Sequence, residues 1–230
     1  MENISSNSNS NHGSKSLEKI EDYDHRKINF CISQPTTPAN YFHLLRRQML
    51  REYRKPLVVL TPKIGLRSPF YVSEISEFFE DKKFEPIIVN KYGTKKNLIF
   101  CTGQIFIEVK KAAEKFFEKN KREANLILIR VEELAPFPEK EIIEVLNKNN
   151  FTGNEKENSK SIWIQEESLN MGAFTYVQPS LNRILKKFNK NMNIDYIGRN
   201  AQCGAIGCLE DHKKEYDILI KELEEFVDKC

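Results

Sequence analysis

The amino-acid sequence predicts an α/β fold with a mainly parallel β-sheet and helices on both faces of the sheet. Two observations carry this prediction. Short apolar runs alternate with segments whose apolar residues recur at helical three-and-four spacing. The segments between the runs are long enough for helical crossovers, which parallel strands need. Four strands are predicted in this repeat, at residues 98–101, 126–129, 162–164 and 194–197.

Each predicted strand is followed by a helix with an apolar face. The first strand turns at Gly103, and Pro136-Phe137-Pro138 begins the helix after the second. The third helix begins beyond Gly172, and a charged helix ends the chain. The residues expected to face inward are Ile105, Val109, Ala112 or Ala113 and Phe116; Ile142, Val145 and Leu146; Phe174, Val177, Leu181, Ile184 or Leu185 and Phe188; and Tyr216, Leu219, Ile220, Leu223 and Phe226.

One helix and one strand precede this repeat. Thr37 is a suitable N-cap and Pro38 suits the first helical position, where a missing N–H costs nothing. The helix is predicted to continue until Pro56 ends it, and the apolar residues 57–60 predict a strand that is covered on both faces. In this helix the apolar residues Phe42, Leu45, Met49 and Tyr53 recur at helical spacing, with the arginines elsewhere on the helix surface.

This first strand has no evident partner in the chain. Unless another sheet takes it, its open edge invites aggregation. We therefore predict that the separate polypeptide docks on another chain or belongs to a longer subunit.

The chain divides into four parts at the sequence level. Residues 1–27 are rich in Asn, Ser and charge and predict a disordered leader or linker. Residues 28–65 hold the first helix and strand, residues 66–89 connect, and residues 90–230 form the main domain. Within the main domain, residues 147–160 are predicted to be an inserted surface loop.

Composition excludes several classes of function. Hydrophobic residues make up 40% and charged residues 30% of the 230 residues, as in ordinary globular proteins, and the net charge of +3 gives no argument for nucleic-acid binding. No apolar run approaches the roughly 20 residues that cross a bilayer. Five cysteines show no C-x-x-C pair, so neither zinc nor a disulfide framework is predicted. The first residues resemble neither a secretory signal nor a transit peptide.

The search for catalytic groups yields few candidates. The chain contains no G-x-G-x-x-G, no Walker lysine loop and no Gly-Asp-Gly segment of the kind that holds magnesium and thiamine diphosphate. His43 stands among arginines on the first helix and is a candidate to face an interface or the active site, although a structural role is the more frequent one for a lone helical histidine. No catalytic residue, cofactor-binding residue or metal ligand is therefore predicted.

Two clusters are candidates for an interface or a ligand. Gln165, Glu166 and Glu167 follow the Trp163 strand, at the sheet edge where open α/β sheets bind ligands or partners. Helix capping is the alternative. Arg54 and Lys55 end the first helix, where they complement its dipole or hold a phosphate group.

Several stretches resemble the dehydrogenase subunit of the 2-oxoglutarate dehydrogenase complex, in that family's own order. These stretches do not exclude its close relative, the 2-oxoadipate dehydrogenase subunit. The resemblance covers roughly residues 28 to 227. The stretches that carry it are Thr36-Thr37-Pro38-Ala39 to Arg46-Arg47-Gln48; Lys55-Pro56-Leu57-Val58-Val59-Leu60-Thr61-Pro62-Lys63; Cys101-Thr102-Gly103; Ile129-Arg130-Val131-Glu132-Glu133-Leu134-Ala135-Pro136-Phe137-Pro138; Trp163-Ile164-Gln165-Glu166-Glu167; Asn170-Met171-Gly172-Ala173-Phe174; and Tyr196-Ile197-Gly198-Arg199.

The resemblance implies a transketolase C-terminal-like domain in residues 90–230. It also implies the last helix and strand of a pyrimidine-binding domain in residues 28–65. The whole subunit is a mitochondrial-matrix enzyme of the tricarboxylic acid cycle that uses thiamine diphosphate and Mg²⁺. The partners that follow are the upstream domains, a homodimer partner and the dihydrolipoyl succinyltransferase core.

No catalytic residue of the family maps onto this chain, so the chain alone is predicted to be inactive. In some relatives a nucleotide or acetyl-CoA activator binds near the positions of Arg54 and Lys55. Departures include Ser168 and Phe174, where the family has proline and tryptophan, and a changed turn at Gln202-Cys203-Gly204.

Two functions remain open at this stage. The chain is either the C-terminal portion of the oxidoreductase, supplying scaffold and dimer contacts, or a stand-alone non-catalytic module of the same fold.

Overall fold

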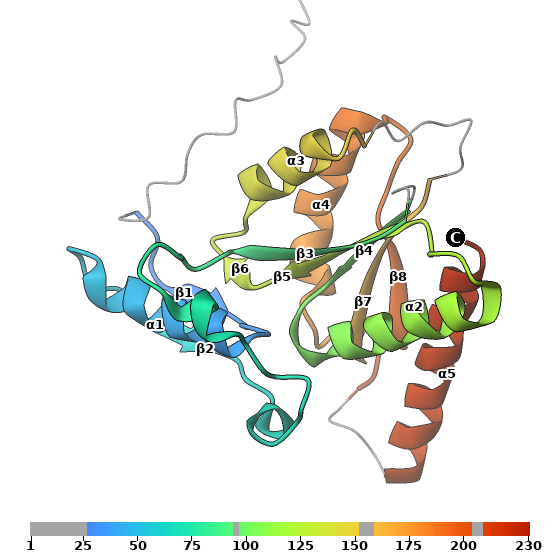
Figure 1. Cartoon of the computed structure of the whole chain (residues 1–230). Coiled ribbons are helices and arrows are strands. Elements are labelled where there is room, and N and C mark those ends of the chain that lie inside the picture. Colours follow the sequence, from blue (N-terminus) through green and yellow to red (C-terminus); the bar gives the residue numbers. More distant parts are fainter. Residues whose placement is uncertain (1–26, 94–96, 152–158, 204–208) are drawn as a thin grey trace, which may run out of the picture.

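The computed structural model describes residues 27–93, 97–151, 159–203 and 209–230 (Figure 1). Within these ranges the strands form a five-stranded sheet and a three-stranded sheet. Several sequence predictions lie outside them: the leader before residue 27, the centre of the predicted loop at 152–158, and Gly204 of the changed turn.

The larger sheet has the strand order β3-β5-β4-β7-β8. Three of its four pairings are parallel, and only β3 runs antiparallel, against β5. The mainly parallel α/β prediction is therefore confirmed. The strands are β3 (Ile87–Tyr92), β4 (Asn97–Cys101), β5 (Leu126–Val131), β7 (Ser161–Ser168) and β8 (Asp195–Arg199).

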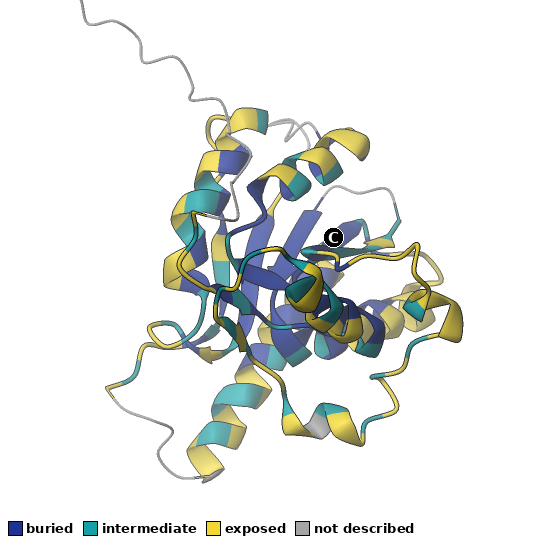
Figure 2. Ribbon diagram, turned by 90° about the vertical axis from the view of Figure 1, so that its left-hand side faces the viewer, coloured by how far each residue is buried: buried dark blue, intermediate teal, exposed yellow. Residues whose placement is uncertain are grey.

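Helices cover both faces of this sheet. Helices α3 (Glu139–Lys148) and α4 (Phe174–Phe188) pack on one face, and α2 (Phe106–Asn120) and α5 (Leu209–Asp228) on the other (Figure 1). The two cores use alternate residues of each strand. Figure 2 shows the strands as a buried layer between helices whose outer faces are exposed. All residues of β5 are buried, which is why this strand reads as a continuous apolar run.

The predicted inward faces of the later helices are confirmed in most positions. In α4 the side chains of Val177, Leu181, Ile184 and Leu185 are fully buried, because they repeat at helical spacing toward the sheet. Val145, Phe188, Tyr216 and Ile220 are only partly buried. Helix α3, which was predicted to begin at Pro136, begins at Glu139, since residues Glu133–Ala135 form a short strand, β6.

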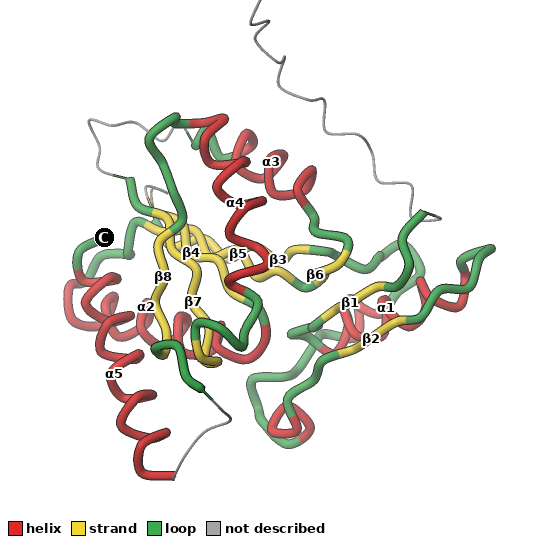
Figure 3. The backbone as a smooth tube through the Cα atoms, turned by 180° about the vertical axis from the view of Figure 1, so that it is seen from behind, coloured by secondary structure: helices red, strands yellow, loops and turns green. Residues whose placement is uncertain are grey.

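The smaller sheet consists of β1 (Cys31–Ser33), β2 (Leu57–Val59) and β6, in the order β2-β1-β6. Strand β1 is parallel to β2 and antiparallel to β6. The prediction that the strand at 57–60 lacks a partner in the chain was therefore wrong. Three-residue strands in polar surroundings leave too short a pattern to detect. Figure 3 shows β1 and β2 side by side with the first helix against them.

The first helix, α1, runs from Pro38 to Leu50. The Thr37 hydroxyl accepts a hydrogen bond from the N–H of Asn40 at 3.2 Å, which confirms the predicted cap. The helix ends before the predicted stop at Pro56, because Arg51 is already extended.

The apolar face predicted for α1 lies on the exposed side of the helix, and Tyr53 lies beyond the end of the helix. Phe42, Leu45 and Met49 are 42%, 42% and 70% exposed, whereas Ala39, Asn40, His43 and Leu44 are buried. The polar residues on the buried side find hydrogen-bond partners inside the chain, so they point inward. Strand β2 is likewise not covered on both faces, since Val58 and Leu60 are 44% and 43% exposed.

The connecting segment contains two short 3-10 helices, η1 (Lys63–Leu66) and η2 (Ile75–Phe78). Phe78 packs against Phe42 of α1, with ring centroids 5.7 Å apart. None of the helices in the described ranges has both the length and the apolar character that a membrane span requires.

Candidate functional site at the seam between the sheets

The two sheets meet at a buried carboxylate, Glu132. This residue follows β5 directly and is fully buried. Its carboxylate accepts hydrogen bonds from the backbone N–H and the hydroxyl of Thr36 and from Nδ2 of Asn40, at 2.6 Å for the N–H and 3.1 Å for the amide. Arg130 donates to the Thr36 hydroxyl at 3.0 Å. This polar latch fixes the start of α1 to the end of β5.

Burial and hydrogen bonding act on Glu132 in opposite directions. Desolvation raises the pKa of this carboxyl above its ordinary value of 4.5, while Arg130 and the bonds from Thr36 and Asn40 lower it. The net direction is upward, because the group has no contact with solvent.

A second acidic residue holds the middle of α1. Glu133 is buried and accepts two hydrogen bonds from the Arg47 guanidinium, at 3.0 and 2.5 Å. The same guanidinium lies 4.2 Å above the centre of the Phe84 ring. Two-point binding of this kind needs arginine, since lysine has no planar fork. The Arg46-Arg47 and Glu132-Glu133 stretches, far apart in sequence, thus belong to one contact region.

The seam also contains a close approach of a side chain to a glycine. Gly103 has φ +69°, and a Cβ there would lie 2.3 Å from Nε2 of Gln34. The Thr102 hydroxyl lies 3.2 Å from Oε1 of Gln34 and 2.8 Å from the carbonyl oxygen of Val131. Glycine is required here for both its backbone conformation and its missing side chain.

Of the predicted interface residues, Gln165 has a structural role. It is fully buried, and its side-chain oxygen accepts hydrogen bonds from Nε1 of Trp163 at 2.9 Å and from the N–H of Phe174 at 3.0 Å. Its amide donates to the Ser168 carbonyl at 3.1 Å. Gln165 therefore caps the start of α4, as the capping alternative required.

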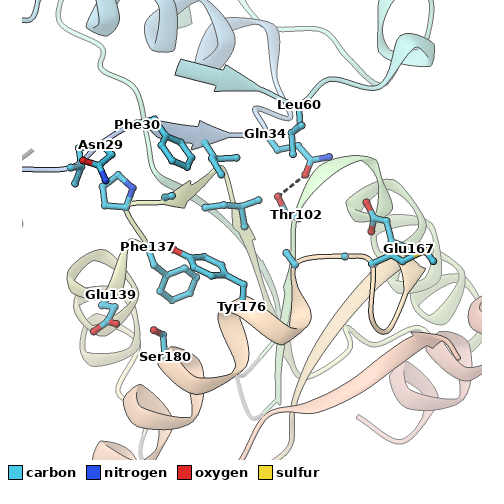
Figure 4. A pocket seen from close by; sticks show the side chains of 18 of the residues that line it. Asn29, Phe30, Gln34, Leu60, Thr102, Phe137, Glu139, Glu167, Tyr176 and Ser180 are labelled. Carbon is cyan, nitrogen blue, oxygen red and sulfur yellow. Dashed lines mark hydrogen bonds between the residues drawn. The ribbon is translucent and has the colours of Figure 1, made fainter. Parts of the chain in front are cut away.

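The neighbouring carboxylates lie in different environments. Glu166 accepts both of its hydrogen bonds from Nε2 of Gln104, at 2.9 and 3.0 Å. Glu167 is exposed and lines a cavity between the sheets (Figure 4). Partial desolvation of its carboxyl group, together with the nearby Glu166 charge, raises the pKa of Glu167.

His43 lies on α1, away from this carboxylate cluster. It is buried, and its Nε2 donates a hydrogen bond to the carbonyl oxygen of Glu77 at 2.7 Å. The contact ties α1 to η2. The geometry agrees with the structural role that is usual for a lone helical histidine.

Arg54 and Lys55 lie in the turn between α1 and β2. Arg54 is exposed, and its guanidinium donates to the carbonyl oxygen of Arg51. The carbonyl oxygen of Lys55 accepts a hydrogen bond from Nε2 of Gln48 at 2.5 Å. The guanidinium and ammonium groups form no ion pair among the described residues.

The cavity at the seam has a volume of about 830 Å³. Strand β1 and its leading residues form one wall, and β6 with the following loop and α4 forms the other (Figure 4). Glu139 at its edge is paired with Arg183. The sequence analysis predicted neither this cavity nor the latch. A usable signal was present, because charged residues directly after a buried strand are expected to be buried themselves and therefore require partners.

Comparison with known proteins places these features in a family. Residues 72–223 match the model of the 2-oxoglutarate dehydrogenase C-terminal family. The 2-oxoglutarate dehydrogenase E1 component of Rickettsia felis is 38% identical over 84% of this chain. A probable 2-oxoadipate dehydrogenase complex component E1 homolog of Dictyostelium discoideum is 37% identical over 85%, and the Homo sapiens 2-oxoadipate dehydrogenase complex component E1 is 39% identical over 87%.

A solved structure supports the fold. A split-gene transketolase, described as an inactive β4 tetramer, aligns with 87% of this chain and 57% of its own, with a TM-score of 0.54 and 16% sequence identity. The fold is therefore transketolase-like.

The chain spans about a fifth of the length of these curated relatives, from 19% of the Rickettsia felis protein to 21% of the Homo sapiens protein. The similarity nonetheless covers most of this sequence, including both sides of the latch. The chain belongs to the 2-oxoglutarate dehydrogenase C-terminal family of E1 components.

Proposed function

We propose that this chain acts as the C-terminal portion of the thiamine-dependent first component of a 2-oxoglutarate or 2-oxoadipate dehydrogenase complex. The single observation that carries the proposal is the similarity to E1 components of both kinds over 84–87% of the chain. Relatives named for 2-oxoglutarate and relatives named for 2-oxoadipate both match, so the proposal does not specify the chain length of the 2-oxo acid.

In this role the chain supplies scaffold and contacts instead of reacting groups. The whole subunit would decarboxylate the 2-oxo acid and pass the acyl group, succinyl for 2-oxoglutarate, to lipoamide. Thiamine diphosphate, when bound, supplies the carbanion chemistry of that reaction.

The described residues do not fit the cofactor's metal. No three His, Cys, Asp or Glu side chains among them converge as Mg²⁺ would need. The carboxylates at the seam instead accept hydrogen bonds from Thr36, Asn40 and Gln104. We therefore assign the diphosphate and Mg²⁺ to the part of the subunit that precedes this chain.

The exposed apolar face of α1 and β2 supports docking on that part. Large side chains are exposed along it: Phe42, Leu45, Met49, Leu50, Val58 and Leu60. An apolar surface of this kind on a single chain marks an interaction site. Among the described residues no strand pairs with the outer edge of β2, and a further strand can pair its backbone groups. The upstream domains are the proposed occupant, followed in the assembly by a homodimer partner and the dihydrolipoyl succinyltransferase core, in the mitochondrial matrix.

Arg54 and Lys55 are proposed as part of a regulator site. Their charged groups lie in the turn between α1 and β2 and form no ion pair among the described residues, so both can take a phosphate. Replacing both with alanine in the full subunit should remove the response to a nucleotide or acetyl-CoA activator and leave basal activity intact. An unchanged response would remove this part of the proposal.

The central test joins residues 28–230 to the upstream part of the Rickettsia felis E1 component, in place of that protein's own C-terminal part. We expect the chimera to form the dimer and to decarboxylate 2-oxoglutarate or 2-oxoadipate with thiamine diphosphate and Mg²⁺. The isolated chain should be inactive under the same conditions. Activity of the isolated chain would overturn the proposal.

The stand-alone module makes a different prediction. In that case the reading frame stops upstream of Met1, no neighbouring gene encodes the missing domains, and the isolated chain is a stable monomer. An open upstream frame that encodes a Gly-Asp-Gly segment supports the oxidoreductase subunit.

A further inference from the structure

Helix α1 packs on one face of the smaller sheet, and the opposite face borders the seam cavity. Side chains alternate between the two faces along a strand, and Ile32 of β1 pairs with Val58 of β2. The preceding pair, Cys31 and Leu57, lies on the side of α1, because the Arg51 guanidinium at the end of α1 donates to Sγ of Cys31 at 3.5 Å. Ile32 lines the seam cavity, so Ile32 and Val58 lie on the face opposite α1.

This free face, formed by Phe30, Ile32, Val58 and Leu60, is apolar and partly exposed. Phe30, Val58 and Leu60 are 47%, 44% and 43% exposed. Phe30 and Leu60 line the cavity (Figure 4). Helix α4 and the loop before it form the far wall, where Met171 is 47% exposed. The cavity therefore separates α4 from the sheet and leaves apolar side chains half exposed on both walls.

A parallel pair of strands needs cover on both of its faces. Strands β1 and β2 are parallel, and parallel sheets occur almost only where helices cover both faces. The sequence of β2 has the same implication, since residues 57–60 are all apolar and do not alternate with polar residues. Helix α1 supplies one layer. A second helix on the free face is the layer that the architecture calls for.

The cavity has room for part of such a helix. A helix about 10 Å across occupies roughly 400 Å³ per turn, so a volume of about 830 Å³ accommodates about two turns. The Glu132 latch joins α1 to the end of β5 and thereby fixes the spacing of the two walls. The ion pair of Glu139 and Arg183 lies at the edge of the cavity, so the helix needs an apolar side toward the sheet and a polar side toward this edge.

We propose that an amphipathic helix from the upstream part of the subunit packs on the free face, with its apolar side in the seam cavity. This inference rests on the proposed function. The chain spans 19% of the length of the Rickettsia felis relative, so under that function most of the subunit is available to supply the helix. Val58 and Leu60, with Phe30 and Ile32, then form a docking surface separate from the outer side of α1.

Thiol labelling of the chimera with the upstream Rickettsia felis part measures this contact. Phe30→Cys and Met171→Cys place thiols on the two walls, and Phe117→Cys places one on α2, where the side chain is similarly exposed at 50%. Reaction with N-ethylmaleimide is followed site by site by peptide mass spectrometry, in the chimera and in the dilute isolated chain. We expect both wall thiols to react about tenfold more slowly in the chimera, and the α2 thiol to react equally fast in both proteins.

A fourth thiol separates failure of this inference from failure of the proposed function. Met49→Cys lies on the outer side of α1, which the proposed function already assigns to docking. Slow labelling there, with unchanged labelling of Phe30→Cys and Met171→Cys, would overturn the helix and leave the proposed function standing. Unchanged labelling at all three positions would overturn both. Equal slowing of Phe117→Cys would also overturn the inference, because the protection would then not belong to the seam.

Cross-linking identifies the secondary structure of the occupant. Photo-methionine replaces methionine in the chimera, so that Met171 carries a small photoreactive group at the cavity. We expect cross-links from Met171 to upstream residues that are about three or four positions apart, the spacing along one helix face. Cross-links to alternate upstream residues would reveal a strand and overturn the proposal, as would products confined to residues 28–230.

Discussion

The backbone N–H of Thr36 donates a hydrogen bond of 2.6 Å to the Glu132 carboxylate, although 96 positions separate the two residues. Asn40 bonds the same carboxylate from the first turn of α1. The fully buried Glu132 side chain thus holds the start of α1 against the end of β5, a strand of the larger sheet.

Removing this carboxylate should destabilise the chain strongly. Glu132→Ala leaves the Thr36 N–H and hydroxyl and one Asn40 amide hydrogen without their acceptor and the buried Arg130 without its nearby negative charge, and we expect a loss of about 3 kcal/mol in the free energy of unfolding. Urea denaturation followed by Trp163 fluorescence measures it. The exposed Glu144, replaced by alanine, is the control and should change stability by less than about 0.5 kcal/mol. Equal losses in the two variants would show that the latch is not holding the sheets together.

A substitution at Gly103 tests the second seam contact. Gly103→Ala forces a side chain into positive φ and against Gln34, so we expect a loss of about 2 kcal/mol. Adding Gln34→Ala should recover part of this loss, because only the backbone strain remains. The double-mutant cycle by urea denaturation measures the coupling. Strictly additive losses would mean that Gln34 and Gly103 do not press on one another.

These contacts mark the limit of what the sequence could predict. The central strands were predictable because β5 and β4 are buried on both faces and therefore continuously apolar. Strand β3 was missed because it is an edge strand with only Ile87 buried, and β1 and β6 because each has three residues.

The site was harder to predict for a related reason. Gln165 and His43 were candidates by residue type and position, but their roles depend on which carbonyl or N–H the fold brings to them. The apolar face of α1 was predicted from its spacing. In this chain it faces outward, since periodicity reports an apolar face but not what covers it.

Alkaline pH should destabilise the fold through buried phenols. Burial raises the pKa of Tyr196 and of Tyr71 from 10.0 to about 12. Between these values the unfolded chain has lost protons that the folded chain keeps, so stability is full below pH 10 and falls as the pH rises toward 12. Urea midpoints across this range measure the fall.

Tyr196→Phe separates the ionisation from the hydrogen bond. The variant loses the bond of 2.9 Å from the phenol to the Arg199 carbonyl oxygen, which costs about 1 kcal/mol at neutral pH. Its stability should then decline less steeply than that of the wild type above pH 10. The exposed Tyr41, replaced by phenylalanine, serves as control. An identical alkaline slope in wild type and Tyr196→Phe would contradict the assigned pKa.

The exposed face of α1 should control the association of the isolated chain. Met49 and Leu50 are 70% and 75% exposed, and burying each against a partner contributes about 2 kcal/mol. Met49→Lys with Leu50→Lys should therefore shift the isolated chain from oligomers toward monomer in sedimentation velocity. In the chimera with upstream E1 domains, the same pair should weaken assembly. Phe117→Lys, which removes an exposed aromatic from α2, should change neither result. A wild-type chain that sediments as a single monomer species would show that this face needs no partner, because no association would then remain for the lysines to relieve.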